Sequence, residues 1–259
     1  MINKFGAQGG NPTVKVDGNE NEGNKKVEWI WANKVISPWH DIPYKCSAGL
    51  VSFVCEIPKF ERAKMECATK LPHNPIIQDK NKDGTPRFYH GPIFWNYGYV
   101  PQTWENPETE DKELGYKGDA DPLDVVEIGM VKRQVGSVTP VKPLGILAMI
   151  DSGEVDWKMI CIAEDDPLFD ELDNIEDLER KCPGTISGIR EWFRWYKTPD
   201  MKEKNIFGFK EEVLGVKKCW EVINHVHQDW KDLMMGKAGN GQFWTGVEEG
   251  DALNLSVSH

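Results

Sequence analysis

The sequence predicts an α+β fold, in which a closed or strongly curved sheet is covered on its outside by helices. Two observations predict it: strand-like runs occupy the chain up to about residue 165, and helical periodicity replaces them afterwards. Since no change in composition marks a linker, we expect one domain at residues 26–236. A flexible arm at 1–25 would precede it, and a tail at 237–259 would follow it.

Strands are expected in five places. The run at residues 50–57 is apolar and ends at Pro58, and residues 62–68 alternate between apolar and charged side chains. Further apolar runs fill residues 123–131, 144–150 and 157–163. A short loop joins the last two, so they are expected to form a hairpin.

Three helices are expected after residue 165. Asp166 followed by Pro167 is typical of a helix start, and Pro183-Gly184 would end that helix. The second helix would bury a stripe formed by Ile186, Ile189, Trp192, Phe193 and Tyr196. The third would run from about residue 210 to 235, where apolar residues recur at helical spacing.

The charge balance excludes some kinds of partner. Acidic residues number 42 and basic residues 31, which gives a net charge of −11 at pH 7. A nucleic-acid binder needs a basic surface to neutralise phosphates, so we expect no nucleic acid as a partner. No apolar stretch approaches the roughly 18 residues of a membrane span, so we expect no membrane partner.

The cysteines indicate a reducing compartment. All six are scattered singly without a Cys-x-x-Cys pair, so a structural zinc site is not expected. Free thiols persist in the cytosol, and no secretory signal is visible at the start of the sequence. We therefore expect a cytoplasmic protein.

The strongest local signal is an acidic turn before the apolar run at 123–131. Asp119, Asp121 and Asp124 fall within six residues, and Gly118 and Pro122 stiffen the chain around them. Like charges held this closely repel each other and require a compensating cation. Oxygen ligands without Cys or His point to Mg²⁺ or a similar ion. The alternative is an acidic turn solvated by water.

A second acidic pair is expected at the neck of the predicted hairpin. Asp151 closes one strand and Asp156 opens the next, so the two carboxylates would face each other across adjacent strands. Lys158 lies two residues beyond Asp156 and therefore on the same face of that strand. The alternative is a solvent-exposed hairpin end.

Other polar residues could join the same site. Glu56, Lys64 and Glu66 lie opposite apolar strand faces, which also fits the wet side of a half-exposed sheet. Arg87 and the pair Tyr196-Lys197 could hold phosphate oxygens, since Arg offers a fork, Lys a point charge and Tyr a neutral donor. Each of these alone also fits an ordinary surface position.

Two further patterns resemble metal sites but are better explained otherwise. Residues 79–84 match the first half of an EF-hand loop, but His90 stands where the closing Glu belongs and Pro86 interrupts the loop. His225 and His227 are two residues apart on a helix and do not share a face. We expect a polar hairpin turn in the first case and ordinary helix positions in the second.

The polar residues together favour one kind of chemistry. Many carboxylates, several cations and tyrosine hydroxyls, without an evident nucleophile, fit metal-assisted phosphoryl transfer to water.

At this point the chain resembles the soluble family I inorganic pyrophosphatases of the eukaryotic type. The segment Gly118-Asp-Ala-Asp-Pro-Leu-Asp124 matches the family signature Asp-x-Asp-Pro-x-Asp. The resemblance covers roughly residues 30 to 235 in order. Its other motifs are Ser37-Pro-Trp-His-Asp-Ile-Pro43, Glu56-Ile-Pro58, Ala63-Lys64-x-Glu66, Asn74-Pro-Ile-Ile-Gln-Asp79, Asn96-Tyr-Gly98, Pro101-Gln-Thr-Trp-Glu105, Asp156-Trp-Lys158 and Trp192-Phe-Arg-x-Tyr-Lys197.

This resemblance implies an OB-like five-stranded β-barrel with peripheral helices, which hydrolyses pyrophosphate to two phosphates and forms a homodimer. It implies several Mg²⁺ ions, with Mn²⁺ or other divalent ions as possible substitutes. The implied metal ligands are Asp119, Asp124, Asp151, Asp156 and Glu66.

The resemblance also assigns roles around the substrate. Asp121 would be the general base that deprotonates the attacking water. The implied phosphate-binding residues are Lys64, Arg87, Tyr97, Lys158, Tyr196 and Lys197. Arg87, Tyr97 and Lys197 would act with Asp121 in catalysis, while Glu56 and Glu105 would support the site from nearby.

The chain departs from the family pattern in two places. The family usually has a Tyr four residues before the Tyr of Asn96-Tyr-Gly98, but this chain has Ile93 there and loses that expected donor. The Arg-Trp pair that often follows Glu-Ile-Pro at the dimer contact is Lys59-Phe60 here.

Two other functions stay open. The site could act on other phosphoanhydrides, such as nucleoside triphosphates or short polyphosphate, although no pocket rich in aromatic residues and Gly is evident for a base. The chain could instead be a non-catalytic subunit, although such a protein need not keep five mutually repelling carboxylates together.

Overall fold

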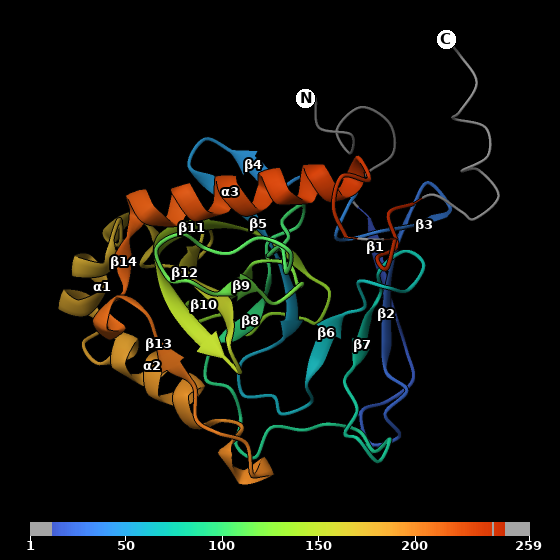
Figure 1. Ribbon diagram of the computed structural model, residues 1–259, viewed down its shortest axis with the longest axis horizontal. Helices are drawn as coiled ribbons and strands as arrows, with labels where there is room; N and C mark the ends of the chain where they lie inside the picture. Colours follow the sequence, from blue (N-terminus) through green and yellow to red (C-terminus); the bar gives the residue numbers. More distant parts are fainter. Residues whose placement is uncertain (1–11, 240, 247–259) are drawn as a thin grey trace.

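Apolar strands from the middle of the chain close into a five-stranded barrel (Figure 1). The computed structural model describes residues 12–239 and 241–246. The barrel strands are β5 (Leu50–Ile57), β8 (Asn96–Tyr99), β10 (Asp124–Glu127), β11 (Val138–Asp151) and β12 (Glu154–Ala163). Their order is β11-β12-β10-β8-β5, and β5 closes the ring by pairing antiparallel with β11, where Val54 faces Val138. The predicted barrel is therefore confirmed.

Shorter strands extend this sheet or form a second one. β4 (Lys45–Ser47), β9 (Lys117–Gly118), β13 (Ile206–Phe207) and β14 (Leu214–Gly215) pair with the edges or ends of barrel strands. The second sheet contains β1 (Thr13–Asp17), β2 (Lys26–Trp31), β3 (Lys34–Ile36), β6 (Met65–Cys67) and β7 (Ile76–Gln78). It stands beside the barrel, on the right in Figure 1.

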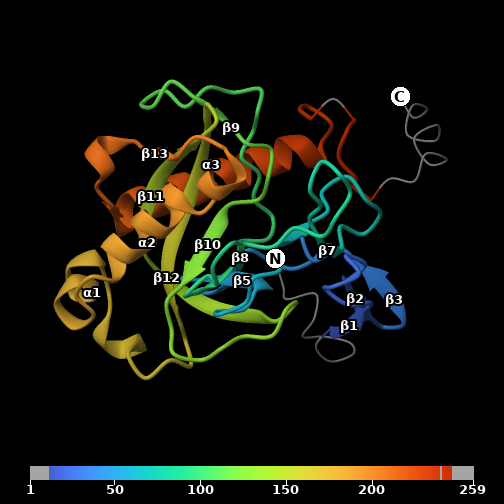
Figure 2. The same ribbon diagram turned by 90° about the horizontal axis from the view of Figure 1, so that it is seen from below.

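The helices lie outside the barrel (Figure 2). They are α1 (Ile175–Lys181), α2 (Thr185–Trp195) and α3 (Val216–Met234), with short 3₁₀ turns at η1 (Phe169–Glu171), η2 (Thr198–Asp200) and η3 (Phe209–Glu211). α3 crosses one side of the barrel, while α1 and α2 lie together at another (Figure 1). None of the helices described here combines the length and the hydrophobicity of a membrane span.

Alternation along β12 separates packing from chemistry. Its odd-numbered residues, such as Trp157 and Met159, belong to an apolar cluster that includes Ile223 of α3. Asp156 and Lys158 lie between them in the sequence and therefore project from the opposite face. The strand thus holds two charged side chains rigidly because its other face is packed under a helix.

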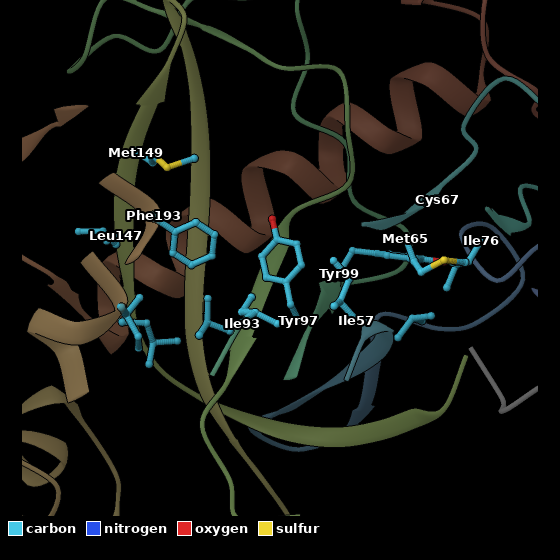
Figure 3. Packing of buried hydrophobic residues seen from close by; sticks show 14 of the residues in the cluster. Ile57, Met65, Cys67, Ile76, Ile93, Tyr97, Tyr99, Leu147, Met149 and Phe193 are labelled. Carbon is cyan, nitrogen blue, oxygen red and sulfur yellow. The ribbon is translucent and has the colours of Figure 1, made fainter. Parts of the chain in front are cut away.

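A second apolar cluster lies on the side of α2 (Figure 3). Phe193 of α2 packs beside Tyr97 of β8, with ring centroids 5.7 Å apart. Met65 and Cys67 of β6 join the same cluster, which confirms the predicted apolar face of residues 62–68. This packing fixes the Tyr97 ring close to the charged face of the barrel.

The first predicted helix starts later than expected. Asp166 does not cap a helix there: its carboxylate is buried and accepts from the backbone N–H groups of Leu168 (2.9 Å) and Met130 (2.7 Å). The segment makes only the turn η1, and α1 begins after Asn174, whose side chain accepts from the N–H of Asp177. The pattern correctly predicted a capped turn but not a helix, because the Asp166 carboxylate also accepts from the distant backbone N–H of Met130.

Three other boundaries differ from expectation. α3 begins at Val216 rather than near residue 210, because Lys210 has φ of 55° and Leu214 pairs with Ile146 of β11. β10 ends at Glu127, whose side chain accepts from the N–H of Gly129. No element was expected before residue 26, yet β1 forms there, since the alternating residues 13–17 pair with β2.

The predicted N-terminal arm and C-terminal tail lie partly outside the described residues. Of the arm, residues 1–11 are outside, and of the tail, residues 240 and 247–259. The described part of the tail packs on the body: Phe243 contacts Trp104, with ring centroids 5.3 Å apart, and Trp244 donates its N–H to the carbonyl of Thr69. All six cysteines are free, as expected, and four are buried.

Candidate active site

The charged face of the barrel opens into a cavity of about 260 Å³. It brings together all but two of the residues predicted for the site. They are Glu56, Lys64, Glu66, Arg87, Tyr97, Asp119, Asp121, Asp124, Asp151, Asp156, Lys158 and Tyr196. The other two, Glu105 and Lys197, are buried and lie next to this lining: Glu105 is grouped with Asp119 and Asp156, and Lys197 donates to Asp151.

Backbone contacts hold the acidic turn between β9 and β10. Glu105 donates its N–H to the carbonyl of Asp121, and its own carbonyl accepts from Ala120, both at 2.9 Å. A Cβ on Gly118 would lie 2.4 Å from the Glu105 carbonyl oxygen, so this close approach requires glycine. The backbone that carries the acids is therefore held in place.

Three carboxylates converge at the base of this turn. Glu105, Asp119 and Asp156 each offer an oxygen, and these oxygens lie within 4.8 Å of one another. Burial raises the pKa of each carboxyl well above its usual range, and repulsion from neighbouring carboxylates adds to the shift. Oε2 of Glu105 is buried with no hydrogen-bond partner in the described part of the chain. A buried carboxylate that has an orphaned oxygen and lies close to two further carboxylates fits the coordination of a divalent cation.

Lys158 provides the positive charge at the neighbouring carboxylates. Its ammonium group, on a side chain only 2 % exposed, contacts both Asp124 and Asp156. Tyr97 donates its hydroxyl to Asp124 and accepts from Lys158 at 3.0 Å. A buried lysine is stable here because two carboxylates compensate its charge.

Asp121 is exposed to the cavity and has no cation partner within the described chain. Protein atoms surround the cavity, and this desolvation raises the pKa of Asp121 to about 7, with further contributions from the negative charges of Glu66 and Asp124. Among the carboxylates of the acidic turn, it therefore stands out as one that can exchange a proton near neutral pH.

Lys64 and Arg87 are held beside each other by a residue that the sequence did not assign to the site. Asp79 accepts from Arg87 at 2.7 Å and from Lys64 at 3.0 Å. Backbone bonds connect the same three residues, from Arg87 N–H to the carbonyl of Asp79 and from Asp79 N–H to the carbonyl of Lys64. The segment 79–84 is the polar turn expected, but its first residue orients two cations.

Asp151 lies at the end of β11, next to the end of α2. The expected direct pairing with Asp156 is wrong: Asp151 faces Glu154 across the hairpin and Asp156 faces Met149, although both carboxylates line the cavity. Lys197 donates to its carboxylate, and the Tyr196 hydroxyl lies 3.4 Å from it. Burial acts to raise the pKa of Asp151, but hydrogen bonds from Lys197 and Ser152 outweigh it and lower the pKa below its usual value. Asp151 is thus an ionised carboxylate, paired in a way that Asp121 is not.

The remaining predicted members lie on β5 and β6. Glu56 is buried and accepts from the N–H of Cys67 at 2.6 Å, and burial raises its pKa well above the usual range. Glu66 contacts Lys64. His225 and His227 stay outside the site: His225 lies 3.6 Å from Asp229, while His227 bonds the carbonyl of Gln102.

Sequence reasoning missed other residues that line the cavity. Tyr89, Glu154 and Lys202 lie on it, whereas Ile93 is fully buried in the apolar cluster of Figure 3 and does not line it. Tyr89 follows Arg87 by two residues, a spacing that favours the same side of an extended segment and could have found it. Glu154 is the first residue of β12 and has the same parity as Asp156 and Lys158, so the period of two could have found it as well. Lys202 lies in a loop, where no periodicity identifies it.

An aromatic groove lies next to the cavity, contrary to expectation. It has a volume of about 210 Å³ and is lined by Tyr89, His90, Gly91, Trp192, Trp195, Tyr196 and Pro199. Tyr89 and Tyr196 line both spaces. The rings of these two residues contact each other edge to face, with centroids 5.6 Å apart, so they form the wall between the groove and the cavity.

Comparison with known proteins gives a consistent result. The family model described as inorganic pyrophosphatase matches residues 53–231. Soluble inorganic pyrophosphatase 1, chloroplastic, of Chlamydomonas reinhardtii is 46% identical over 209 residues, covering 81% of this chain and 74% of that protein.

Two solved structures are similar over most of their length. The type I inorganic pyrophosphatase of Toxoplasma gondii superposes with a TM-score of 0.82 at 45% identity, covering 86% of this chain and 99% of that one. A truncated vacuolar soluble pyrophosphatase of Trypanosoma cruzi, in complex with PPi, gives 0.82 at 39% identity and covers 91% of this chain and 96% of its own.

Proposed function

Since the chain belongs to the inorganic pyrophosphatase family of hydrolases, we propose that it hydrolyses pyrophosphate to two phosphates with the help of Mg²⁺. The observation that carries this proposal is the composition of the cavity. It combines a fixed carboxylate cluster with the cations of Lys64, Arg87 and Lys158. A small polyanion that arrives with metal ions needs both kinds of group in one place.

The carboxylates are the proposed metal ligands. Asp119, Asp124, Asp151, Asp156 and Glu66 would hold Mg²⁺, and the unpaired oxygen of Glu105 makes it a further ligand beside Asp119 and Asp156. When bound, such ions neutralise phosphate charge and lower the pKa of a bound water.

Asp121 is the proposed general base. A base works best when its pKa lies near the working pH, and the pKa of Asp121 is about 7. Its carboxylate faces the cavity without a cation partner in the described residues, so it is free to accept the proton of the attacking water.

The cations and hydroxyls around the cavity would bind the phosphate oxygens. Arg87 uses one of its nitrogens for Asp79, which leaves other N–H groups of the guanidinium for a phosphate. Lys64, Lys158 and Tyr97 are the other proposed contacts from the barrel side, with Tyr196 and Lys197 from the end of α2. Arg87, Tyr97 and Lys197 would stabilise charge that develops on the leaving phosphate.

Phosphate release from pyrophosphate tests this function directly. The full chain is incubated with pyrophosphate and Mg²⁺, with Mn²⁺, or with a chelator. Rapid release that requires a divalent ion is expected. Absence of release under every condition would contradict the proposal and favour the non-catalytic alternative.

The aromatic groove is the observation that favours a nucleoside triphosphate as an alternative substrate. A nucleoside triphosphate could place its base on the rings of Trp192 and Trp195 while its phosphates enter the cavity. The wall formed by Tyr89 and Tyr196 opposes this path, so pyrophosphate remains the proposed substrate. ATP and tripolyphosphate in the same assay distinguish the two, since faster release from ATP would favour the nucleotide.

A homodimer is proposed for the assembly. Phe60, Phe94 and Met130 are each at least half exposed. Their segments adjoin, because Phe60 donates its N–H to the carbonyl of Ile93 and Lys59 donates to the carbonyl of Gly129. Exposed apolar side chains gathered in this way suit a contact with a second copy. Sedimentation of the wild type and of Phe60→Ser would test it, since the variant should shift to monomer.

A cytoplasmic location also stays a proposal. A relative at 46% identity is named as chloroplastic, so membership of the family does not fix the compartment. Imaging of the tagged full-length chain in its own cells would test it.

A further inference from the structure

Tyr89 places an unpartnered hydroxyl in the active-site cavity. The residue is only 5 % exposed, and it lines the cavity together with Lys64, Arg87 and Tyr196. The hydroxyl makes no hydrogen bond to any described residue, although its ring and its backbone are both engaged. A donor on the cavity wall that has no protein partner is available to a ligand that supplies the acceptor.

The ring is fixed before any ligand arrives. Arg62 holds the backbone on both sides, since its carbonyl accepts from Tyr89 N–H at 2.7 Å and its Nε donates to the Tyr89 carbonyl at 2.9 Å. The rings of Trp192 and Tyr196 contact Tyr89 edge to face, at centroid distances of 5.0 and 5.6 Å. Binding to such a hydroxyl costs little side-chain entropy.

The surroundings restrict what the hydroxyl can bind. The ammonium of Lys64 and the guanidinium of Arg87 are near enough that their pKa values respond to Tyr89, and neither group has an acceptor atom. Burial raises the pKa of Tyr89 far above its usual value, so the group stays protonated and can donate. A neutral donor beside two cations is suited to an anionic oxygen.

We propose that the Tyr89 hydroxyl donates a hydrogen bond to a phosphate oxygen of the substrate, on the side of the cavity where Lys64 and Arg87 lie. The inference rests on the proposed function, because it takes the substrate of this cavity to be a phosphate. It adds a phosphate-binding residue from the loop that follows Arg87.

Tyr89→Phe tests the proposal because it removes the hydroxyl and keeps the ring that Trp192 and Tyr196 contact. Tyr44→Phe is the matched control: Tyr44 stacks on His227, with ring centroids 3.8 Å apart, and does not line the cavity. Calorimetry with inorganic phosphate and Mg²⁺ measures binding, and initial rates with pyrophosphate give KM and kcat. Thermal unfolding of each protein checks the fold.

Tyr89→Phe should bind phosphate roughly 10- to 100-fold more weakly, as expected for a lost hydrogen bond to a charged group. Its KM for pyrophosphate should rise, while its melting temperature and the binding by Tyr44→Phe stay unchanged. Wild-type phosphate affinity in Tyr89→Phe would overturn the inference and leave the proposed function intact. A wild-type protein that neither binds phosphate nor releases it from pyrophosphate would instead overturn the proposed function, and this inference with it.

Discussion

Asp121 differs from its neighbours in how its charge is compensated. Asp124 and Asp156 share Lys158, and Asp151 has Lys197, but no cation contacts Asp121 in the described chain. Desolvation raises the pKa of Asp121 to about 7, the charges of Glu66 and Asp124 add to the shift, and no paired cation offsets it. Asp121 therefore differs from Asp124, Asp151 and Asp156 in that no cation in the described chain forms an ion pair with it.

Asp121→Asn should lower turnover about 10²- to 10⁴-fold, the usual contribution of a general base. Mg²⁺ affinity should change little, because Asp121 is not one of the three carboxylates whose oxygens converge. Phosphate release and Mg²⁺ titration measure the two effects. Asp170→Asn, an exposed substitution outside the site, is the control. Near-normal turnover in Asp121→Asn would remove the role of base.

Lys158→Met should destabilise the metal-free protein by about 3–5 kcal/mol, because it leaves Asp124 and Asp156 buried without a positive partner. Mg²⁺ should restore part of the loss, since a bound cation supplies the missing charge. Urea unfolding with a chelator and with Mg²⁺ measures both, and Lys217→Met on the exposed face of α3 is the control. If the variant matched the wild type in chelator, Lys158 would not be the compensating charge.

At the scale of elements, close contact between β5 and β8 positions two walls of the cavity. Cys55 faces Gly98 across the pair, and the neighbours Glu56 and Tyr97 both line the cavity. A Cβ on Gly98 would lie 2.0 Å from the carbonyl oxygen of Val54. The distance between these strands is therefore set by the absence of one side chain.

Gly98→Ala should cost about 1–3 kcal/mol of stability and reduce activity, because the strands must separate and move Glu56 and Tyr97. Gly188→Ala offers a contrast in the interior of α2, where a Cβ would meet Trp95 at an ordinary 3.6 Å. It should stabilise the protein by about 0.5–1 kcal/mol, since alanine restricts the unfolded chain and favours helix. Chemical denaturation measures the free energy of unfolding, which should fall in Gly98→Ala and rise in Gly188→Ala. The same change in both variants would contradict the packing argument.

Sequence patterns predicted strands better than helix starts. The period of two in residues 62–68 and at Asp156 and Lys158 was sufficient, because a strand needs only its two faces to be specified. The cap at Asp166 misled, because its carboxylate serves a distant backbone N–H at Met130. Because this partner lies 36 residues away, the local sequence around Asp166 cannot predict the contact.

At the scale of the whole molecule, the cavity collects residues from Glu56 to Lys202. The acids were predictable because each stands at a strand end or in a stiff turn. Asp79 and Lys202 were not, since they come from loops whose path depends on the folded body. Glu105 needed the family resemblance, because only the structure brings it to Asp119.

The described part of the C-terminal segment is attached to the body through His40. Its Nε2 donates to the carbonyl of Trp244 at 2.8 Å, and its Nδ1 accepts from the indole N–H of Trp230 at 2.9 Å. Both bonds together require the neutral ring. Burial lowers the pKa of His40 from 6.5 to about 4.

Because the folded pKa of His40 lies below the unfolded one, its stabilising effect is complete above pH 6.5 and is lost as the pH falls towards 4. The loss should be on the order of 3 kcal/mol. His40→Gln should remove this part of the pH dependence, whereas His225→Gln, at an exposed position, should keep it. Urea unfolding across this pH interval measures the difference, and parallel curves for His40→Gln and the wild type would contradict it.

The long strand β11 has a consequence for the order of folding. It pairs with β12 through a two-residue turn, but also with β5, where Val138 meets Val54 across 84 residues of chain. The hairpin can form as soon as both its strands exist, whereas closing the ring requires a loop whose entropy must be lost first. Asp151 and Asp156 would thus come together early, while Glu56 joins them only on closure. Formation of the complete site should accordingly coincide with the slow phase of refolding.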